Sequence, residues 1–199
     1  MKIRRLLFAL FLGISHVSSA KGTSDEAATE APGAAGNEAP RSYIGLRVGA
    51  SSGITTGQPE VCGELTPSAF LSIHACGSGA GLWSSSNGRE ISHYRLDWHL
   101  PSAKFGGVFV KALVGAGLAE LQLTSDDPGF KLASTGPRGV ETAGPEFAGI
   151  LRAVLPLEHG FEGIADLTAG LAYFAHAPAL VTPQARVQPF VGVNVGLAF

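Results

Sequence analysis

Residues 187–199 constrain the fold more than any other segment, because apolar side chains alternate with small or polar ones along most of it. A period of two residues indicates a β-strand with one apolar face and one small or polar face. The run is about as long as a tilted strand that crosses a bilayer, roughly 9–11 residues. We therefore predict a final β-strand of membrane-spanning length, with Leu197 and Phe199 on its apolar face.

The chain begins with the three parts of a secretory signal peptide: a basic start, an apolar run over 6–14, and small residues at 18–20. We predict cleavage after Ala20, and the apolar run is too short for a spanning helix. Residues 21–40 are rich in Ala, Gly, Pro and Glu and contain no aromatic residue. Such a segment buries too little surface to fold, so we predict a disordered periplasmic lead before a single domain over 41–199.

Period-two patterns predict eight strands in this domain, over 41–50, 68–76, 80–86, 89–100, 108–123, 145–155, 161–174 and 187–199. The connections between them alternate between long and short, except at the short hairpin signal Asn87-Gly88. Outer-membrane barrels have an even strand number, short periplasmic turns and longer outer loops. The expected fold is an all-β, eight-stranded antiparallel up-and-down transmembrane β-barrel.

Two features favour a membrane barrel over a secreted soluble barrel that resembles lipocalins and binds a small apolar ligand, which is the main alternative. First, the polar faces of the strands mix His, Arg, Asp, Glu, Thr and Gly, as a narrow barrel interior would, and only 15% of all residues are charged. Second, aromatic residues fall near both strand ends and suggest two interfacial girdles: Trp83, Phe147 and Tyr173 at the outer ends, and Trp98, Phe161 and Phe199 at the periplasmic ends.

On this alternation, on the loop pattern and on the terminal Phe199, the chain resembles the small eight-stranded bacterial outer-membrane β-barrel proteins of the OmpX and OmpA-transmembrane-domain kind. The resemblance covers about residues 41–199. It implies a location in the outer membrane of a Gram-negative bacterium, with the lipid bilayer and the barrel-assembly machinery as partners. It also implies that Leu197 and Phe199 form the assembly signal. It implies no particular surface ligand.

The candidate interior cluster begins with His93, Arg95, Asp97 and His99, which alternate on one strand and share its inward face. His and Asp are metal ligands, but the rise of a strand spreads these four over more than about 10 Å, too far for one ion. A hairpin closed at 156–160 would place Arg152 opposite Ile164, with Glu162 and Asp166 as its diagonal neighbours. We expect Arg152 to pair with one or both of these acids inside the barrel.

Cys62 and Cys76 are the two cysteines of the chain. An even count in an exported protein suggests a disulfide. The alternative is two small buried thiols, because Cys76 lies on a predicted inward strand face and Cys62 in the predicted loop over 51–67.

The sequence predicts no enzyme, cofactor or metal. None of the five histidines after the predicted signal peptide is followed two residues later by the serine that barrel lipid A deacylases carry. The formal net charge is −2, and −5 once the three basic residues before Ala20 are removed, which does not favour nucleic-acid binding. An eight-stranded barrel is only wide enough for its side chains, and Phe70, Phe109, Phe174 and Phe190 are expected to help fill it. A structural or surface-interaction role remains as the expectation.

Overall fold

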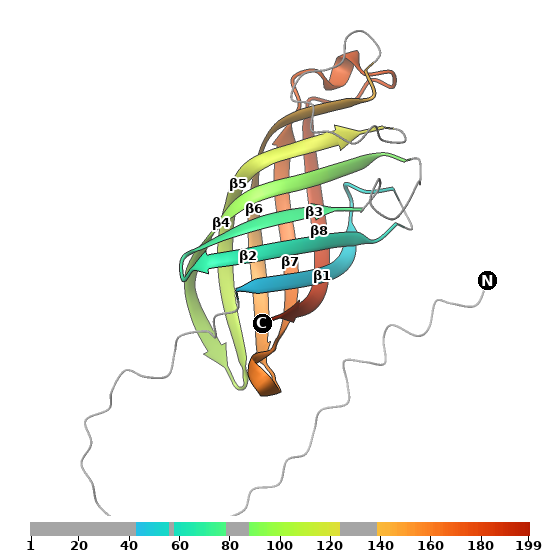
Figure 1. Cartoon of the computed structure of the whole chain (residues 1–199). Helices are drawn as coiled ribbons and strands as arrows, with labels where there is room; N and C mark the ends of the chain where they lie inside the picture. Colours follow the sequence, from blue (N-terminus) through green and yellow to red (C-terminus); the bar gives the residue numbers. More distant parts are fainter. Residues whose placement is uncertain (1–42, 56–57, 79–87, 124–138) are drawn as a thin grey trace, which may run out of the picture. The chain divides into compact units, whose positions relative to one another are not determined.

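A computed structural model describes residues 43–55, 58–78, 88–123 and 139–199 of the chain. Eight antiparallel strands follow one another around a closed barrel, and the last pairs with the first (Figure 1). This confirms the predicted all-β, up-and-down barrel of eight strands. The strands are β1 (Ile44–Ser51), β2 (Glu60–Ser68), β3 (Leu71–Gly77), β4 (Glu90–Phe105), β5 (Val108–Gln122), β6 (Glu141–Pro156), β7 (Glu162–Tyr173) and β8 (Val187–Ala198). The predicted signal peptide and periplasmic lead lie outside the described residues.

The two ends of the barrel differ in their connections. The terminal end holds the start of β1, the end of β8 and the short 3-10 helix η1 (Glu158–Gly160). Its three connections are the short segments 69–70, 106–107 and 157–161. The distal end holds the longer connections 52–59, 78–89, 123–140 and 174–186, the last containing the 3-10 helix η2 (Ala177–Ala179). Long and short connections therefore alternate without the exception that the sequence suggested.

One part of the predicted strand order was wrong. The segment 51–67, predicted to be a loop, contains most of β2, and the segment predicted as the second strand is β3. The predicted strand over 80–86 lies outside the described residues, and β3 pairs directly with β4. Pro59 precedes β2 and Pro67 lies near its end, and these prolines hid the period-two pattern of the strand. Similarly, β6 begins at Glu141 and not at Pro145, because 141–144 continue the ladder with β5.

The outward face of the barrel is apolar over most of its height. Over the described strands, alternation places only three charged residues on this face, Glu90, Glu120 and Glu141, all at the distal ends of β4, β5 and β6. Large apolar side chains are exposed over the rest, for example Leu46 (61%), Phe147 (67%) and Val193 (56%). Phe70 also belongs to this exposed set, so its predicted interior position was wrong.

The inward face has the opposite character. It carries the remaining charged residues of the strands, most of them buried, among them Arg47, Glu64, Arg95, Asp97, Glu146, Arg152 and Asp166. Buried apolar side chains of β4 to β8 and of the segment after β7 lie on both sides of them. Ile91, Leu121, Phe174, Leu180 and Phe190 pack together toward the distal end. Phe109, Leu113, Ile150, Val154 and Ile164 are buried toward the terminal end.

Glycines on the inward face make room for these large side chains. Gly117 is the strand partner of Arg95, and Gly196 is the partner of Arg47. A Cβ at Gly117 would collide with the carbonyl oxygen of Tyr94, and a Cβ at Gly196 with that of Leu46. A narrow barrel thus accommodates two arginines by placing a residue without a side chain beside each.

Among the described residues, no helix is long and apolar enough to cross a membrane.

Candidate functional site

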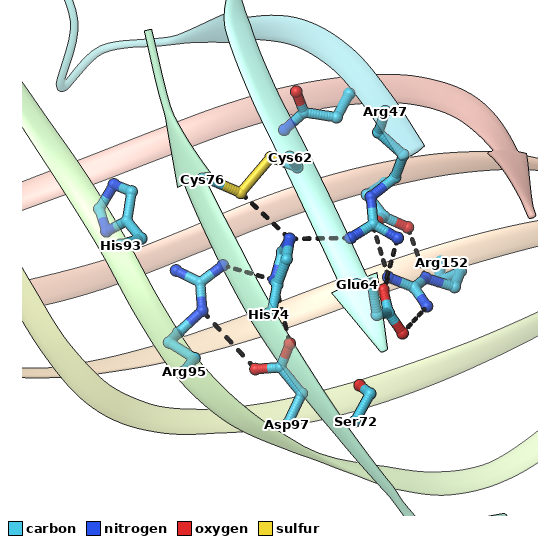
Figure 2. A network of polar contacts seen from close by, with 12 residues as sticks. Arg47, Cys62, Glu64, Ser72, His74, Cys76, His93, Arg95, Asp97 and Arg152 are labelled. Carbon is cyan, nitrogen blue, oxygen red and sulfur yellow. Dashed lines mark hydrogen bonds and ion pairs between the residues drawn. A yellow bond between two sulfur atoms is a disulfide. The ribbon is translucent and has the colours of Figure 1, made fainter. Parts of the chain in front are cut away.

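Four residues form an arginine–carboxylate group in the middle of the barrel: Arg47 on β1, Glu64 on β2, Arg152 on β6 and Asp166 on β7 (Figure 2 labels the first three). Arg152 donates to both oxygens of Asp166 at 2.8 Å, and to both oxygens of Glu64 at 2.8 and 2.6 Å. Arg47 donates to Glu64, and its Nε lies 3.3 Å from Asp166. Two guanidinium groups therefore neutralise two carboxylates, and Arg152 spans the barrel from β6 and β7 to β2.

The bidentate geometry explains why arginine occupies position 152. A guanidinium presents its donors in a planar fork that matches two carboxylates at once, which an ammonium group cannot do. Arg152 and its two acidic partners are all buried, so their charges are weakly screened and depend on one another. The predicted pairing of Arg152 with Asp166 is confirmed.

The strand register corrects the detail of that prediction. Arg152 lies directly opposite Asp166, two residues from the expected partner Ile164. The hairpin closes between Pro156 and Glu162, so its turn covers 157–161 and is shifted by one residue from the turn predicted over 156–160. As a result Glu162 lies at the terminal end of β7 and is not a partner of Arg152, and Glu64 supplies the second carboxylate instead.

A second group, the histidine group, adjoins the first and comprises His74 on β3 with Arg95 and Asp97 on β4. Arg47 Nη2 donates to His74 Nε2 at 2.8 Å, and His74 Nδ1 lies 3.1 Å from Asp97 Oδ2. Because arginine can only donate, Arg47 donates to Nε2, whereas Nδ1 lies between an acceptor, Asp97, and a second donor, Arg95. Arg95 Nη2 also lies 3.1 Å from Nδ1, and Arg95 Nε lies 3.6 Å from the other oxygen of Asp97.

Cys62 and Cys76 form a disulfide beside His74, between the adjacent strands β2 and β3 (Figure 2). The two residues are direct strand partners and both face inward. The structure thus favours the disulfide over the two free thiols, because Cys62 lies on a strand beside Cys76 and not in the predicted loop over 51–67. The donor atoms of Cys62, His74 and Cys76 lie within 4.8 Å of one another. However, the S–S bond removes both thiolates, and the guanidinium of Arg47 faces the histidine, so this set does not suit a cation.

The contacts of Cys76, His74 and Asp97 follow the order of a nucleophile, a base and an orienting acid, because Cys76 Sγ lies 3.1 Å from His74 Nε2. A disulfide sulfur has no thiol proton for the base to remove. In this state the arrangement acts as a structural polar network.

His93 lies on the distal side of the histidine group. Its Nδ1 lies 2.5 Å from Glu146 on β6, and its ring packs against Phe190 with centroids 4.3 Å apart. His93, Arg95 and Asn194 border a small cavity with room for about one water molecule. The fourth predicted member, His99, is half-buried nearer the terminal end and contacts Ser72 Oγ at 3.0 Å.

Three of the four predicted members of the cluster on β4 are therefore fully buried, and all four face inward as expected. The sequence did not single out Arg47, Glu64, His74 or Glu146 as partners. The period-two pattern was visible for Arg47, His74 and Glu146. Glu64 was missed because its segment was interpreted as a loop.

Leu197 and Phe199, the predicted assembly signal, lie where the barrel closes. The backbone of Phe199 accepts hydrogen bonds from Tyr43 and Ile44 and donates to Ile44. Its ring is half-exposed and lies 5.9 Å, between centroids, from that of Phe161.

The chain matches no protein-family model, no curated protein and no solved structure.

Proposed function

We propose that the protein is an integral outer-membrane β-barrel of a Gram-negative bacterium, with a structural or surface-interaction role. Export, periplasmic transit and insertion by the barrel-assembly machinery are parts of this proposal. It is supported by the barrel fold together with the predicted signal peptide.

One observation carries the proposal, namely the placement of charge. A water-soluble barrel exposes its charged side chains and buries its apolar ones, because burying an ion without a partner costs several kcal/mol. Here the described strands do the reverse: charges fill the interior, and the only charged residues on the largely apolar outward face are three glutamates at the distal ends. An apolar solvent around the barrel accounts for both halves of this pattern.

The aromatic residues support the same interpretation. Tyr94, Phe147 and Tyr173 are exposed in the distal halves of their strands. Tyr43, Phe105, Phe161 and Phe199 are exposed at or next to the terminal end. Two such belts are typical of membrane–water interfaces. The predicted member Trp98 lies well inside β4, which extends to Phe105, and Trp83 lies outside the described residues.

The interior favours a structural or surface role over transport or small-ligand binding. Both the polar middle and the two apolar layers are filled with buried side chains. A lipocalin-like protein needs an apolar cavity inside the barrel, whereas the middle of this one holds ion pairs. The longer connections gather at the distal end, which on this proposal faces the cell exterior and carries any surface interaction.

Cell fractionation tests the proposal. The full chain, produced in a Gram-negative host, is expected in the outer-membrane fraction, resistant to alkaline extraction and soluble only in detergent. It should also migrate differently on gels with and without boiling, as folded membrane barrels do. A periplasmic or secreted protein that is monomeric without detergent would contradict the proposal and support the soluble barrel.

A further inference from the structure

The Cys62–Cys76 disulfide lies inside the closed barrel. Cys62 is completely buried and Cys76 is 7% exposed. Its neighbours on the inner side are His74 and Arg47, which also bond to each other (Figure 2). A bond in this position is hard for any oxidant to reach once the barrel has closed.

We infer that Cys62 and Cys76 are oxidised before the barrel closes, so that the oxidised chain is the substrate of barrel assembly. A thiol–disulfide exchange reaction in the exported chain must therefore precede the folding step. This inference uses the export step of the proposed function but not its membrane destination, because a soluble secreted barrel would face the same constraint.

Access is the first argument. Exchange needs a protein oxidant to bring its own sulfur into contact with Cys62 or Cys76. Cys62 is fully buried and Cys76 nearly so, and buried apolar side chains such as Phe174, Phe190 and Phe109 occupy the barrel on its β4 to β8 side. The cavity beside Cys76 has room for about one water molecule, which is far less than a thiol reagent needs.

Locality is the second argument. Cys62 and Cys76 are 14 residues apart on the two strands of one hairpin, which turns at Ala69 and Phe70. A loop of this length is among the least costly to close, because the entropy of closure rises with the logarithm of loop length. The β2–β3 hairpin can therefore bring its sulfurs together while the rest of the chain is unfolded.

The reaction is an ordinary two-electron exchange. One cysteine thiolate attacks the disulfide of a periplasmic dithiol oxidase, forms a mixed disulfide and releases one oxidase thiolate. The second cysteine thiolate of the chain then attacks the chain's own sulfur in the mixed disulfide and releases the second oxidase thiolate. Two electrons pass to the oxidase, the two protons of the cysteine thiols end on its thiols, and the Cys62–Cys76 bond remains.

Chemical reactivity does not explain a slow reaction in the folded state. His74 and Arg47 adjoin the sulfurs, and cationic or basic neighbours favour the reactive thiolate. If exchange is slow in the folded barrel, burial is the cause.

A host that lacks its periplasmic dithiol oxidase tests the order of events. Reduced chain is made first from one promoter, its expression is switched off, and the oxidase is then induced from a second promoter. Gels without boiling separate folded from unfolded protein, and a maleimide that carries polyethylene glycol counts free thiols after denaturation. We expect the unfolded fraction to become oxidised and the folded fraction to keep both thiols. Equal oxidation of the two fractions would overturn the inference.

Reduction of the disulfide in the purified native barrel is the reverse reaction. It tests the burial argument even if reduced chains never fold. Dithiothreitol should reduce the bond at least about a thousandfold more slowly in detergent than in urea. A folded domain of ordinary stability is open in fewer than about one molecule in a thousand. Similar rates in the two conditions would refute the burial argument.

Three variants distinguish the burial of a thiol from its intrinsic reactivity. Cys62→Ser and Cys76→Ser each leave one thiol, which should resist labelling in the folded barrel and react in urea. Leu157→Cys in a background without Cys62 and Cys76 is the matched control. Leu157 is exposed in the turn between β6 and β7, so its thiol should react in both states. Rapid labelling of the lone cysteines in the folded barrel would show that the interior is open.

Discussion

At the scale of single residues, the buried charged side chains of the interior share their partners. Arg152 reaches Asp166 beside it and Glu64 across the barrel, and Arg47 connects the same two acids to His74. The Arg152–Asp166 pair could be predicted because the two residues lie on the two strands of one hairpin. The contribution of Glu64 could not, because 88 residues separate it from Arg152 and only barrel closure brings them together.

Removal of Arg152 should be strongly destabilising. Arg152→Ala leaves Glu64 and Asp166 with one guanidinium, Arg47, between them, and breaking a buried ion pair from one side costs about 3–5 kcal/mol. Asp166→Asn or Glu64→Gln in the Arg152→Ala background should recover part of the loss. Urea unfolding of the barrel in detergent measures both effects.

The matched control for Arg152 is Arg89→Ala. Arg89 lies at the edge of the barrel, where its guanidinium donates to the side chain of Gln188 at 3.0 Å. The contact is part-buried, and its loss should cost about 1 kcal/mol, as for a single hydrogen bond. If Arg152→Ala costs no more than Arg89→Ala, the arginine–carboxylate group does not stabilise the barrel.

Two glycines offer a second test of how the interior is packed. Gly117→Ala should destabilise by about 1–3 kcal/mol, because the new methyl group would collide with the backbone of Tyr94 and Arg95. On the outward face of β6, a methyl group added at Gly149 would meet no atom within 4 Å. Gly149→Ala should therefore be neutral or stabilising by about 0.5–1 kcal/mol. Equal unfolding midpoints for the two variants would contradict the packing described for β4 and β5.

At the scale of elements, strands with a strong apolar face were predictable and strands with a weak one were not. The long ladder of β4 to β8 follows clear alternation, and its strand bounds differ from prediction by a few residues. The pattern of β2 places Glu60, Cys62, Glu64 and Thr66 inward, against Val61, Gly63, Leu65 and Pro67 outward. With two prolines in or beside the strand and little apolar surface, this alternation was masked by residues typical of loops.

The closing strand carries the prediction on assembly. Deletion of Phe199 removes the backbone hydrogen bonds that join it to Tyr43 and Ile44, and the ring beside Phe161. By resemblance to outer-membrane barrels, it also removes the assembly signal. We expect a lower yield of heat-modifiable barrel in the outer membrane and more periplasmic degradation, measured by immunoblotting of cell fractions.

Val187→Ala is the control for the deletion, because Val187 is equally exposed on β8 but lies at the distal end. It should leave the yield unchanged. An undiminished yield after deletion of Phe199 would show that assembly does not depend on this residue.

At the scale of the whole molecule, the fold follows from one inversion. The sheet closes because β1 pairs with β8, and the period of two along each strand places ion pairs inside and apolar residues outside. Sequence alternation predicted this sorting without revealing which interior residues meet, because contacts across the barrel depend on how the strands are staggered when the sheet closes. What surrounds the apolar face is the property that decides between a membrane and a soluble protein.

An arginine scan of the outward face tests that surrounding medium. Leu167 lies near the middle of β7, is 53% exposed, and is flanked on its face by Ala165 and Ala169. In water, Leu167→Arg would be nearly neutral, since an exposed leucine has little to lose. In a bilayer, an arginine near the midplane costs about 2–4 kcal/mol, and the cost falls to about 0–1 kcal/mol near the interface.

Leu157→Arg, at the exposed turn of the terminal end, is the matched control and should be tolerated. Folding into lipid vesicles, followed by urea titration, gives the two free energies. A difference of about 2 kcal/mol or more supports the membrane barrel, whereas equal stabilities of the two variants would mean that the apolar face does not contact lipid.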